Sequence, residues 1–438
     1  MFKLKETIKK RIIDFQKEEF EYIKRDIKIS FVQDMVTTIV GVRKSGKTYL
    51  TYQLIDELIE NGKIENKEFV CYLHFDDEQL MGLQCDDLYL IDETFYSLID
   101  DFSKSVLFIF DEIHKIKGWE NFVLRINKHK NATVIITGSS ADLEEGKVSR
   151  QLRGKTMTNY LFPLSFKEFL KFREVNISFN RMGTAEIILL EKHFDDYLKR
   201  GSFPALANSE NNLIVSILKN YYHSIIETDF LLTDGVGNNI VCKDFVTYLL
   251  HNNGGKYTHK KTFNTLRSFG HKFTEERIPA WFDLAKKCYF MNCAEIYSSS
   301  IKKVQQNYRK IYCIDWALAN SVSFPTEERL PVNLESVVYW ELQRRNKKIS
   351  YQLCSRDKYE IDFIVYDYFE KPQSAIQVCW DISDKETLNR EIRPFKYIRK
   401  EFANIELILI VKSQTLNRIE IPNDIKIISI CNWLIESE

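Results

Sequence analysis

Short, continuous apolar runs separated by helix-like stretches dominate the first 140 residues. The runs lie at 35–40, 68–75, 106–110 and 132–137, and they are rich in β-branched and aromatic residues. Runs of this length without polar alternation are typical of strands that are buried on both faces of a parallel sheet. The pattern predicts an α/β domain whose ligand lies at the carboxyl ends of its strands, preceded by a charged helical arm at residues 1–34.

A phosphate-binding loop directly follows the first run. The full Gly-x-x-x-x-Gly-Lys-Thr pattern is present, as Gly41, Val42, Arg43, Lys44, Ser45, Gly46, Lys47 and Thr48. Glycines let backbone N–H groups approach an anion, and the helix-like run that starts at Tyr49 adds its positive N-terminus. We therefore expect residues 41–49 to bind ATP, with Lys47 reaching the β- and γ-phosphates as a catalytic residue and Thr48 ligating Mg²⁺.

The third apolar run ends in two acids, Asp111 and Glu112. An apolar strand followed by Asp-Glu, downstream of a phosphate loop, is the Walker B pattern. We expect Asp111 to hold Mg²⁺ and Glu112 to act as the catalytic base that orients and deprotonates the attacking water. A strand that simply ends in two solvated acids is the alternative.

The fourth run ends in polar residues that would lie beside the γ-phosphate. Thr137, Ser139 and Ser140 are the candidates for a side chain that senses this phosphate. Of these, Ser139 is assigned to the nucleotide site. An ordinary Gly-Ser turn at the end of a strand is the competing interpretation.

Further motifs in a fixed order carry a family resemblance. They are Phe-Asp-Glu-Ile-His-Lys-Ile-Lys-Gly-Trp-Glu (110–120), Ile-Ile-Thr-Gly-Ser-Ser (135–140), Pro-Leu-Ser-Phe-Lys-Glu-Phe (163–169), Gly-Ser-Phe-Pro (201–204), Glu-Ser-Val-Val-Tyr-Trp-Glu-Leu (335–342) and Glu-Ile-Asp-Phe-Ile-Val (360–365). The chain resembles the bacterial and archaeal AAA-type P-loop ATPases that carry a carboxyl-terminal domain of unknown function. The resemblance spans nearly the whole chain and implies an ATPase core at 1–162 and a small helical lid at 163–238.

The chain departs from that family after the fourth strand. The family has Leu-x-Gly-Arg where this sequence has Leu-Arg-Gly-Lys at 152–155. A cation remains, but the planar, bidentate phosphate contact of an arginine is lost. Arg43, Arg125, Arg150 and Arg153 all remain candidates for an arginine finger.

Residues 239–320 are predicted to form a winged helix. Helix-like runs at 244–252, 258–269 and 279–289 precede alternating stretches at 289–298 and 304–314. Pro279 suits the first turn of a helix, so we expect the third helix to begin there. The region is rich in basic residues, namely Lys256, His259, Lys260, Lys261, Arg267, His271, Lys272, Arg277, Lys286, Lys287, Lys302, Lys303, Arg309 and Lys310. This excess is consistent with contacts to the DNA backbone, and a solvated face that docks a protein partner is the alternative.

The last region, 321–438, resembles the restriction-endonuclease-like PD-(D/E)XK fold in its order of elements. The expected elements are a helix at 334–345, strands at 349–354, 359–366 and 374–380, a helix at 385–399, a strand at 405–411 and a segment at 425–430. Glu335 or Glu341, with Asp362, supplies acids, but Gln377-Val378-Cys379 stands where the fold needs (D/E)-x-Lys. Because an amide cannot replace a carboxylate and a thiol cannot replace a lysine, we expect an α/β nuclease-like domain that is inactive.

Composition narrows the class of protein. The 438 residues are 44% hydrophobic and 28% charged with zero net charge, as in soluble globular proteins. The nine cysteines show no Cys-x-x-Cys spacing and lie mostly in apolar runs, which favours free thiols in a reducing cytoplasm. No apolar run approaches the length of a membrane span, so a cytoplasmic protein without a membrane partner is expected.

These observations predict Mg²⁺-dependent ATP binding and hydrolysis that drives a conformational switch coupled to DNA or to a protein partner. One alternative is an ATP-controlled, metal-dependent nuclease. The other is a nucleotide-binding interaction scaffold that does not hydrolyse ATP.

Overall fold

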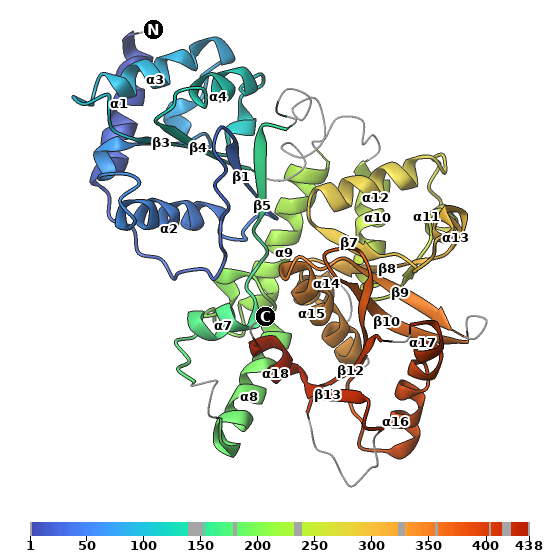
Figure 1. Ribbon diagram of the computed structural model, residues 1–438. Coiled ribbons are helices and arrows are strands. Elements are labelled where there is room, and N and C mark those ends of the chain that lie inside the picture. The colour runs from blue at the N-terminus through green and yellow to red at the C-terminus, as the bar shows by residue number, and fades with distance from the viewer. Residues whose placement is uncertain are drawn as a thin grey trace. The chain divides into compact units, whose positions relative to one another are not determined.

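The chain folds into two compact units, Met1–Phe162 and Pro163–Glu438, which are drawn in Figure 1. We describe them from a computed structural model. The structure describes residues 2–138, 152, 154–177, 182–231, 239–322, 329–354, 358–402, 404–413 and 422–436.

The first unit is built on a five-stranded parallel sheet in the order β2-β3-β4-β1-β5. Its strands are β1 (Val36–Val40), β2 (Val70–His74), β3 (Val106–Asp111), β4 (Ala132–Gly138) and β5 (Thr156–Tyr160). Every residue of β1 and β3 is buried, as expected for strands covered on both faces. The parallel α/β sheet is confirmed, but β5 was missed because Thr-Met-Thr-Asn-Tyr has no apolar run.

Helices flank this sheet, as Figure 1 shows. They are α1 (Phe2–Lys17), α2 (Lys47–Glu60), α3 (Tyr89–Tyr96) and α4 (Glu120–Ile126). The first helix buries Ile8, Ile12 and Phe15, and the Phe15 ring stacks on Tyr72 with centroids 4.2 Å apart. The expected helical arm at 1–34 is therefore too long: the helix ends at Lys17, and residues 18–34 continue without helix.

The second unit begins with helices. They are α7 (Phe166–Phe172), α8 (Thr184–Arg200), α9 (Ile214–Ser224) and a π-helical turn at Ile225–Phe230. Ser165 caps α7: its hydroxyl accepts from the Glu168 N–H, and the Glu168 carboxylate accepts from the Ser165 N–H. Gly201 ends α8, and a side chain there would collide with the buried carboxylate of Asp315.

Five helices and a small antiparallel sheet follow in the described residues 239–322. The elements are α10 (Asn239–His251), β6 (Lys256–Tyr257), α11 (His259–Ser268), α12 (Arg277–Lys287), β7 (Met291–Ala294), α13 (Ile301–Gln306), β8 (Arg309–Cys313) and α14 (Trp316–Val322), with sheet order β6-β8-β7. Two expectations were wrong. The third helix begins at Arg277, two residues before Pro279, and the stretch from 304 to 306 belongs to a helix capped by Ser300.

A mixed five-stranded sheet, ordered β13-β12-β11-β10-β9, completes the second unit. The elements are α15 (Leu330–Arg344), β9 (Ile349–Cys354), β10 (Tyr359–Tyr366), β11 (Pro372–Cys379), α16 (Lys385–Ile392), α17 (Phe395–Glu401), β12 (Glu406–Val411), β13 (Ile425–Ser429) and α18 (Ile430–Ile435). Strands β9 to β11 pair antiparallel, and β11 to β13 pair parallel. The single helix expected at 385–399 is in fact two helices, because Pro394 lies at the break.

Candidate nucleotide site

The phosphate loop connects β1 to α2 in the first unit. Gly46 takes φ +97° and Lys44 takes φ +66°, so the loop passes through the left-handed region just before the helix. A Cβ atom at Gly41 would lie 2.2 Å from the backbone oxygen of Leu161, which leaves room for no other residue. The loop leads directly into the N-terminus of α2, where an anion binds favourably.

Lys47 and Glu112 face each other at this loop, and both are nearly buried. The Lys47 ammonium donates to the carbonyl oxygens of Gly41 (3.1 Å) and Val42 (3.4 Å), and lies 4.0 Å from Glu112 Oε1. Glu112 Oε2 lies 3.5 Å from His114 Nε2 and finds no hydrogen-bond partner among the described residues. A cation and an acid with unused hydrogen-bonding capacity are thus held at one point beside the loop.

Asp111 is fully buried at the end of β3 and is held by hydroxyl groups. Its Oδ2 accepts from Thr48 Oγ1 (2.7 Å) and Tyr72 Oη (2.8 Å), and its Oδ1 accepts from Thr137 Oγ1. The His74 imidazole lies 3.5 Å from Oδ2. Carboxylate and hydroxyl oxygens are the ligands that Mg²⁺ prefers, and Asp111 and Thr48 already meet, so this pair fits the ion.

Two residues that support the loop were missed by the sequence analysis. Tyr72, on β2, donates to Asp111, and burial raises the pKa of its phenol well above the ordinary value, so it remains a donor. Arg25 is buried and donates to the backbone oxygens of Ser45 and Phe162, both at 2.8 Å. Neither has a local motif: the contacts join segments 20 to 137 residues apart.

The remaining predicted site residues are placed as follows. Ser45 is buried within the loop, and Tyr49 is 58% exposed on α2. Ser139, Ser140, Arg150 and Arg153 lie outside the described residues. Of the candidate arginine fingers, Arg125 forms a two-pronged ion pair with Asp92, which already engages its guanidinium.

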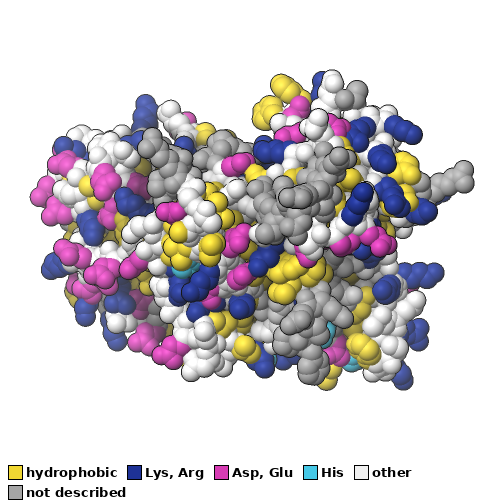
Figure 2. Space-filling view, turned by 90° about the horizontal axis from the view of Figure 1, so that it is seen from below, with side chains coloured by type: hydrophobic (Ala, Val, Ile, Leu, Met, Phe, Trp, Pro, Cys, Tyr) yellow, Lys and Arg dark blue, Asp and Glu magenta, His cyan; other side chains and the backbone are white. Residues whose placement is uncertain are grey.

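The basic residues of 239–320 differ in their exposure and in their ion pairs. Lys310 was expected among the residues that contact phosphate, but it is 3% exposed and cannot reach a nucleic-acid backbone. Arg309 pairs with Glu295, and His271 pairs with Asp244. Figure 2 shows one face of the whole molecule, over which basic and acidic side chains are interspersed. The exposed members are Lys256, Lys260, Lys261, Arg267, Lys272, Arg277, Lys302 and Lys303.

Comparison with known proteins places the chain. It is 30% identical over 396 residues to the uncharacterised protein MJ1544 of Methanocaldococcus jannaschii, covering 89% of this chain and 84% of that protein. The chain belongs to the MJ1544 family. An uncharacterised protein of Haemophilus influenzae is 26% identical and matches over 92% of this chain and 95% of its own length.

Two family models match separate parts of this member of the MJ1544 family. Residues 33–170 match an AAA domain, which contains the loop, Asp111 and Glu112, so the first unit is an AAA-type domain with a P-loop NTPase fold. Residues 191–329 match a domain of unknown function, DUF8612. None of the described helices is both long and apolar enough to cross a membrane.

Solved structures with similarity include the Walker-type ATPase PABY2304 of Pyrococcus abyssi, at 14% identity and TM-score 0.39, over 66% of this chain and 90% of that one. The Aeropyrum pernix ORC1 protein, solved in complex with DNA, aligns at 12% identity and TM-score 0.30, over 66% of this chain and 86% of that one. Both scores are too low to support a statement about this chain.

Proposed function

We propose that the chain is a Mg²⁺-dependent ATPase whose turnover drives a conformational switch. The observation that carries the proposal is the meeting of the phosphate loop with the acids of β3: Thr48 contacts Asp111, and Lys47 faces Glu112. These residue types at the carboxyl end of a parallel sheet are those that phosphoryl transfer requires.

Each side chain then has a role. Backbone N–H groups of residues 41–49 and Lys47 hold the phosphates of ATP. Thr48 and Asp111 would hold Mg²⁺, which neutralises charge on the β- and γ-phosphates when it is bound. Glu112 accepts the proton of the attacking water, and its unused oxygen is the acceptor available for that proton. Thr137, near the end of β4, and Ser139, which lies outside the described residues, are our candidates to sense the γ-phosphate.

The proposed output lies in the second unit. We assign a helical lid to 163–238, a winged helix to 239–320 and a nuclease-like domain to 321–438, with DNA as the partner and a protein as the alternative. The exposed lysines at the start of α11, Lys260 and Lys261, support a role in backbone contact. All nine cysteines are free thiols, which supports a reducing compartment such as the cytoplasm.

The proposal is tested by phosphate release with and without duplex DNA. We expect Glu112→Gln to keep ATP binding and to lower the rate of phosphate release roughly 100-fold, the lower end of the usual range for a general base. Glu93→Gln, an exposed acid on α3, is the matched control and should match wild type. Stimulation of release by DNA, weakening as salt rises, would support DNA as the partner. Equal rates for wild type and Glu112→Gln would reject hydrolysis at this site.

A further inference from the structure

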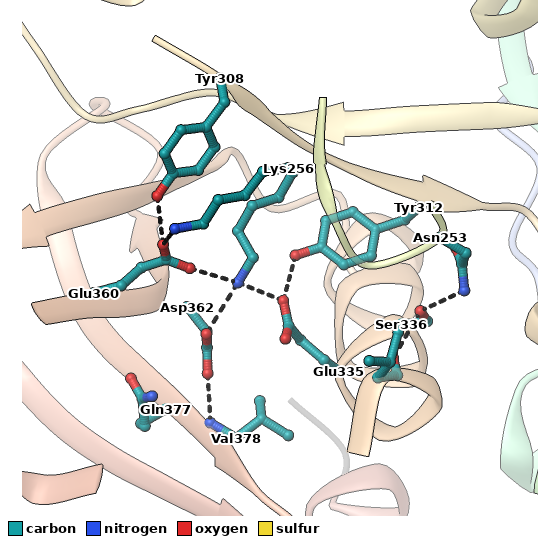
Figure 3. A network of polar contacts seen from close by, with 12 residues as sticks. Asn253, Lys256, Tyr308, Tyr312, Glu335, Ser336, Glu360, Asp362, Gln377 and Val378 are labelled. Atoms are coloured by element: carbon teal, nitrogen blue, oxygen red, sulfur yellow. Dashed lines mark hydrogen bonds and ion pairs between the residues drawn. The ribbon is translucent and has the colours of Figure 1, made fainter. Parts of the chain in front are cut away.

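A second cluster of buried charges lies in the carboxyl-terminal unit, and Figure 3 shows it from close by. The Lys310 ammonium lies 2.5 Å from Glu335 Oε1, 3.1 Å from Glu360 Oε1 and 3.0 Å from Asp362 Oδ1. The Lys310 side chain is 4% exposed, and the three acids are 10–22% exposed. Three carboxylates from two elements thus converge on one cation.

The fold brings these residues together from distant parts of the sequence. Lys310 lies on β8, within the segment predicted to be a winged helix, whereas Glu335 lies on α15. Glu360 and Asp362 are two residues apart on β10, so they point to the same face of the sheet. The pairing of β10 with β9 is interrupted between Ile361 and Ile364, an irregularity that lies beside Asp362.

Each carboxylate of the cluster also accepts a hydrogen bond from a group other than lysine. The Lys310 ammonium donates to Asp362 at 3.0 Å and forms ion pairs with Glu335 and Glu360. Tyr312 donates to Glu335 at 2.6 Å, Tyr308 donates to Glu360, and the Val378 N–H donates to Asp362 at 3.0 Å.

A second cation lies nearby. The ammonium of Lys256 lies 3.4 Å from Glu360 and 4.4 Å from the centre of the Tyr308 ring. The carboxylates are therefore compensated by groups of the chain itself, as a buried cluster of acids requires.

With Lys310 in place, the position between the carboxylates is filled by an ammonium group. Contacts of 2.5–3.1 Å are hydrogen-bond lengths, whereas Mg²⁺ and Ca²⁺ hold oxygen ligands at roughly 2.0–2.6 Å. Within the described parts of the chain, no group of three His, Cys, Asp or Glu side chains is arranged to hold a metal ion. On the neighbouring strand, Gln377 offers a neutral amide, which donates to Glu391.

We propose that the ammonium of Lys310 occupies the cation position of a carboxylate site formed by Glu335, Glu360 and Asp362. The site binds the chain's own lysine in place of a divalent metal ion, and it does not cleave nucleic acid. Glu335 is the helix acid that belongs to the cluster, because Glu341 instead pairs with Arg344 and Arg345. The same contacts fasten β8 to β10 and α15, so the segment 239–320 is anchored to the mixed sheet through this cluster.

The proposal is independent of ATP hydrolysis and is tested without nucleotide. In the full-length chain, Lys310→Ala removes the internal cation, and we expect the unfolding midpoint to fall by roughly 5–10 °C. Added Mn²⁺ should recover part of that loss and give a bound signal in electron paramagnetic resonance. Lys303→Ala, an exposed lysine on α13, is the matched control and should show neither effect.

The carboxylates provide the second arm of the test. Lys310→Ala/Asp362→Asn should lose the Mn²⁺ signal and be more stable than Lys310→Ala alone, because one unpaired charge has been removed. A Lys310→Ala variant that gains no Mn²⁺ site would overturn the proposal.

Measurements on the wild-type chain test the proposal even if the lysine variants do not fold. It should bind no Mn²⁺ at this cluster and cut no DNA. Mn²⁺ binding or metal-dependent cleavage that is lost in Asp362→Asn would show that the cluster takes a metal ion and would overturn the proposal.

Discussion

Each of the two units brings lysine and buried carboxylates together, and the two clusters differ in what neutralises the acid. In the first unit, the hydrogen-bond donors to Asp111 among the described side chains are the hydroxyl groups of Thr48, Tyr72 and Thr137, which carry no charge. In the second unit, the charged ammonium of Lys310 donates to Asp362 and forms ion pairs with Glu335 and Glu360. The same residue types therefore build a site suited to receive a cation in one unit and a site that contains its own cation in the other.

Lys47→Ala is the substitution from which we expect the largest effect, a loss of ATP-dependent phosphate release. The Lys47 ammonium donates to the backbone carbonyl oxygens of Gly41 and Val42 and lies 4.0 Å from Glu112, whereas the Lys310 ammonium lies within 3.1 Å of three carboxylates. We expect ATP-dependent phosphate release to fall by roughly 100-fold or more. The exposed Lys128→Ala is the control. A Lys47→Ala enzyme with normal turnover would remove the distinction between the two lysines.

Arg25→Ala tests how the phosphate loop of the first unit is held in place. Arg25 donates to the Ser45 and Phe162 carbonyl oxygens from a buried position, so its loss removes two hydrogen bonds to the backbone. We expect about 2 kcal/mol lower stability of the unit and weaker ATP binding, measured by denaturation and calorimetry. Arg25→Lys should recover little, because an ammonium cannot span both oxygens. Lys24→Ala, on the exposed side, serves as the control, and unchanged ATP affinity in Arg25→Ala would contradict this supporting role.

The pH dependence of the free energy of unfolding tests the second cluster. We expect this change in free energy to be the smallest of the effects. Burial raises the pKa of Glu335 from 4.5 to about 7, and the Asp362 charge adds to this, while the Lys310 charge opposes it. Folding then binds a proton between these two values, so the contribution of Glu335 to stability falls as pH rises from about 4.5 to about 7.

We expect a loss of about 1–2 kcal/mol over this range in guanidinium denaturation. Glu335→Gln should flatten the dependence, because it removes the titrating carboxyl. Identical pH profiles for wild type and Glu335→Gln would show that Glu335 does not titrate there.

The residues of the candidate nucleotide site could be selected from the sequence more readily than those of the second cluster, and the reason is physical. The loop from Gly41 to Thr48 works through local backbone geometry, so its residues must be contiguous and are visible as a motif. Tyr72, Arg25 and Lys310 act through contacts between distant segments, and nothing in their immediate neighbours marks them. Lys310 was grouped with surface lysines because β8, Arg-Lys-Ile-Tyr-Cys, does not alternate clearly between polar and apolar residues.

The same limit applies to strands. Runs such as Val106–Phe110 were found because both faces are apolar, whereas β5 pairs with β1 through a polar sequence at the edge of the sheet. Around β10, the expected strand bounds, Tyr359–Tyr366, agree with the structure. From the sequence alone, either Glu335 or Glu341 could be the helix acid that accompanies Asp362. The structure shows that it is Glu335, because Glu335 and Asp362 both contact Lys310.

The most direct test of the account is a count of bound Mn²⁺ in the presence of a non-hydrolysable ATP analogue. We predict one tightly bound ion per wild-type chain, none in Asp111→Asn and one in Asp362→Asn. Two ions per chain, or a single ion that is lost in Asp362→Asn and kept in Asp111→Asn, would contradict the account.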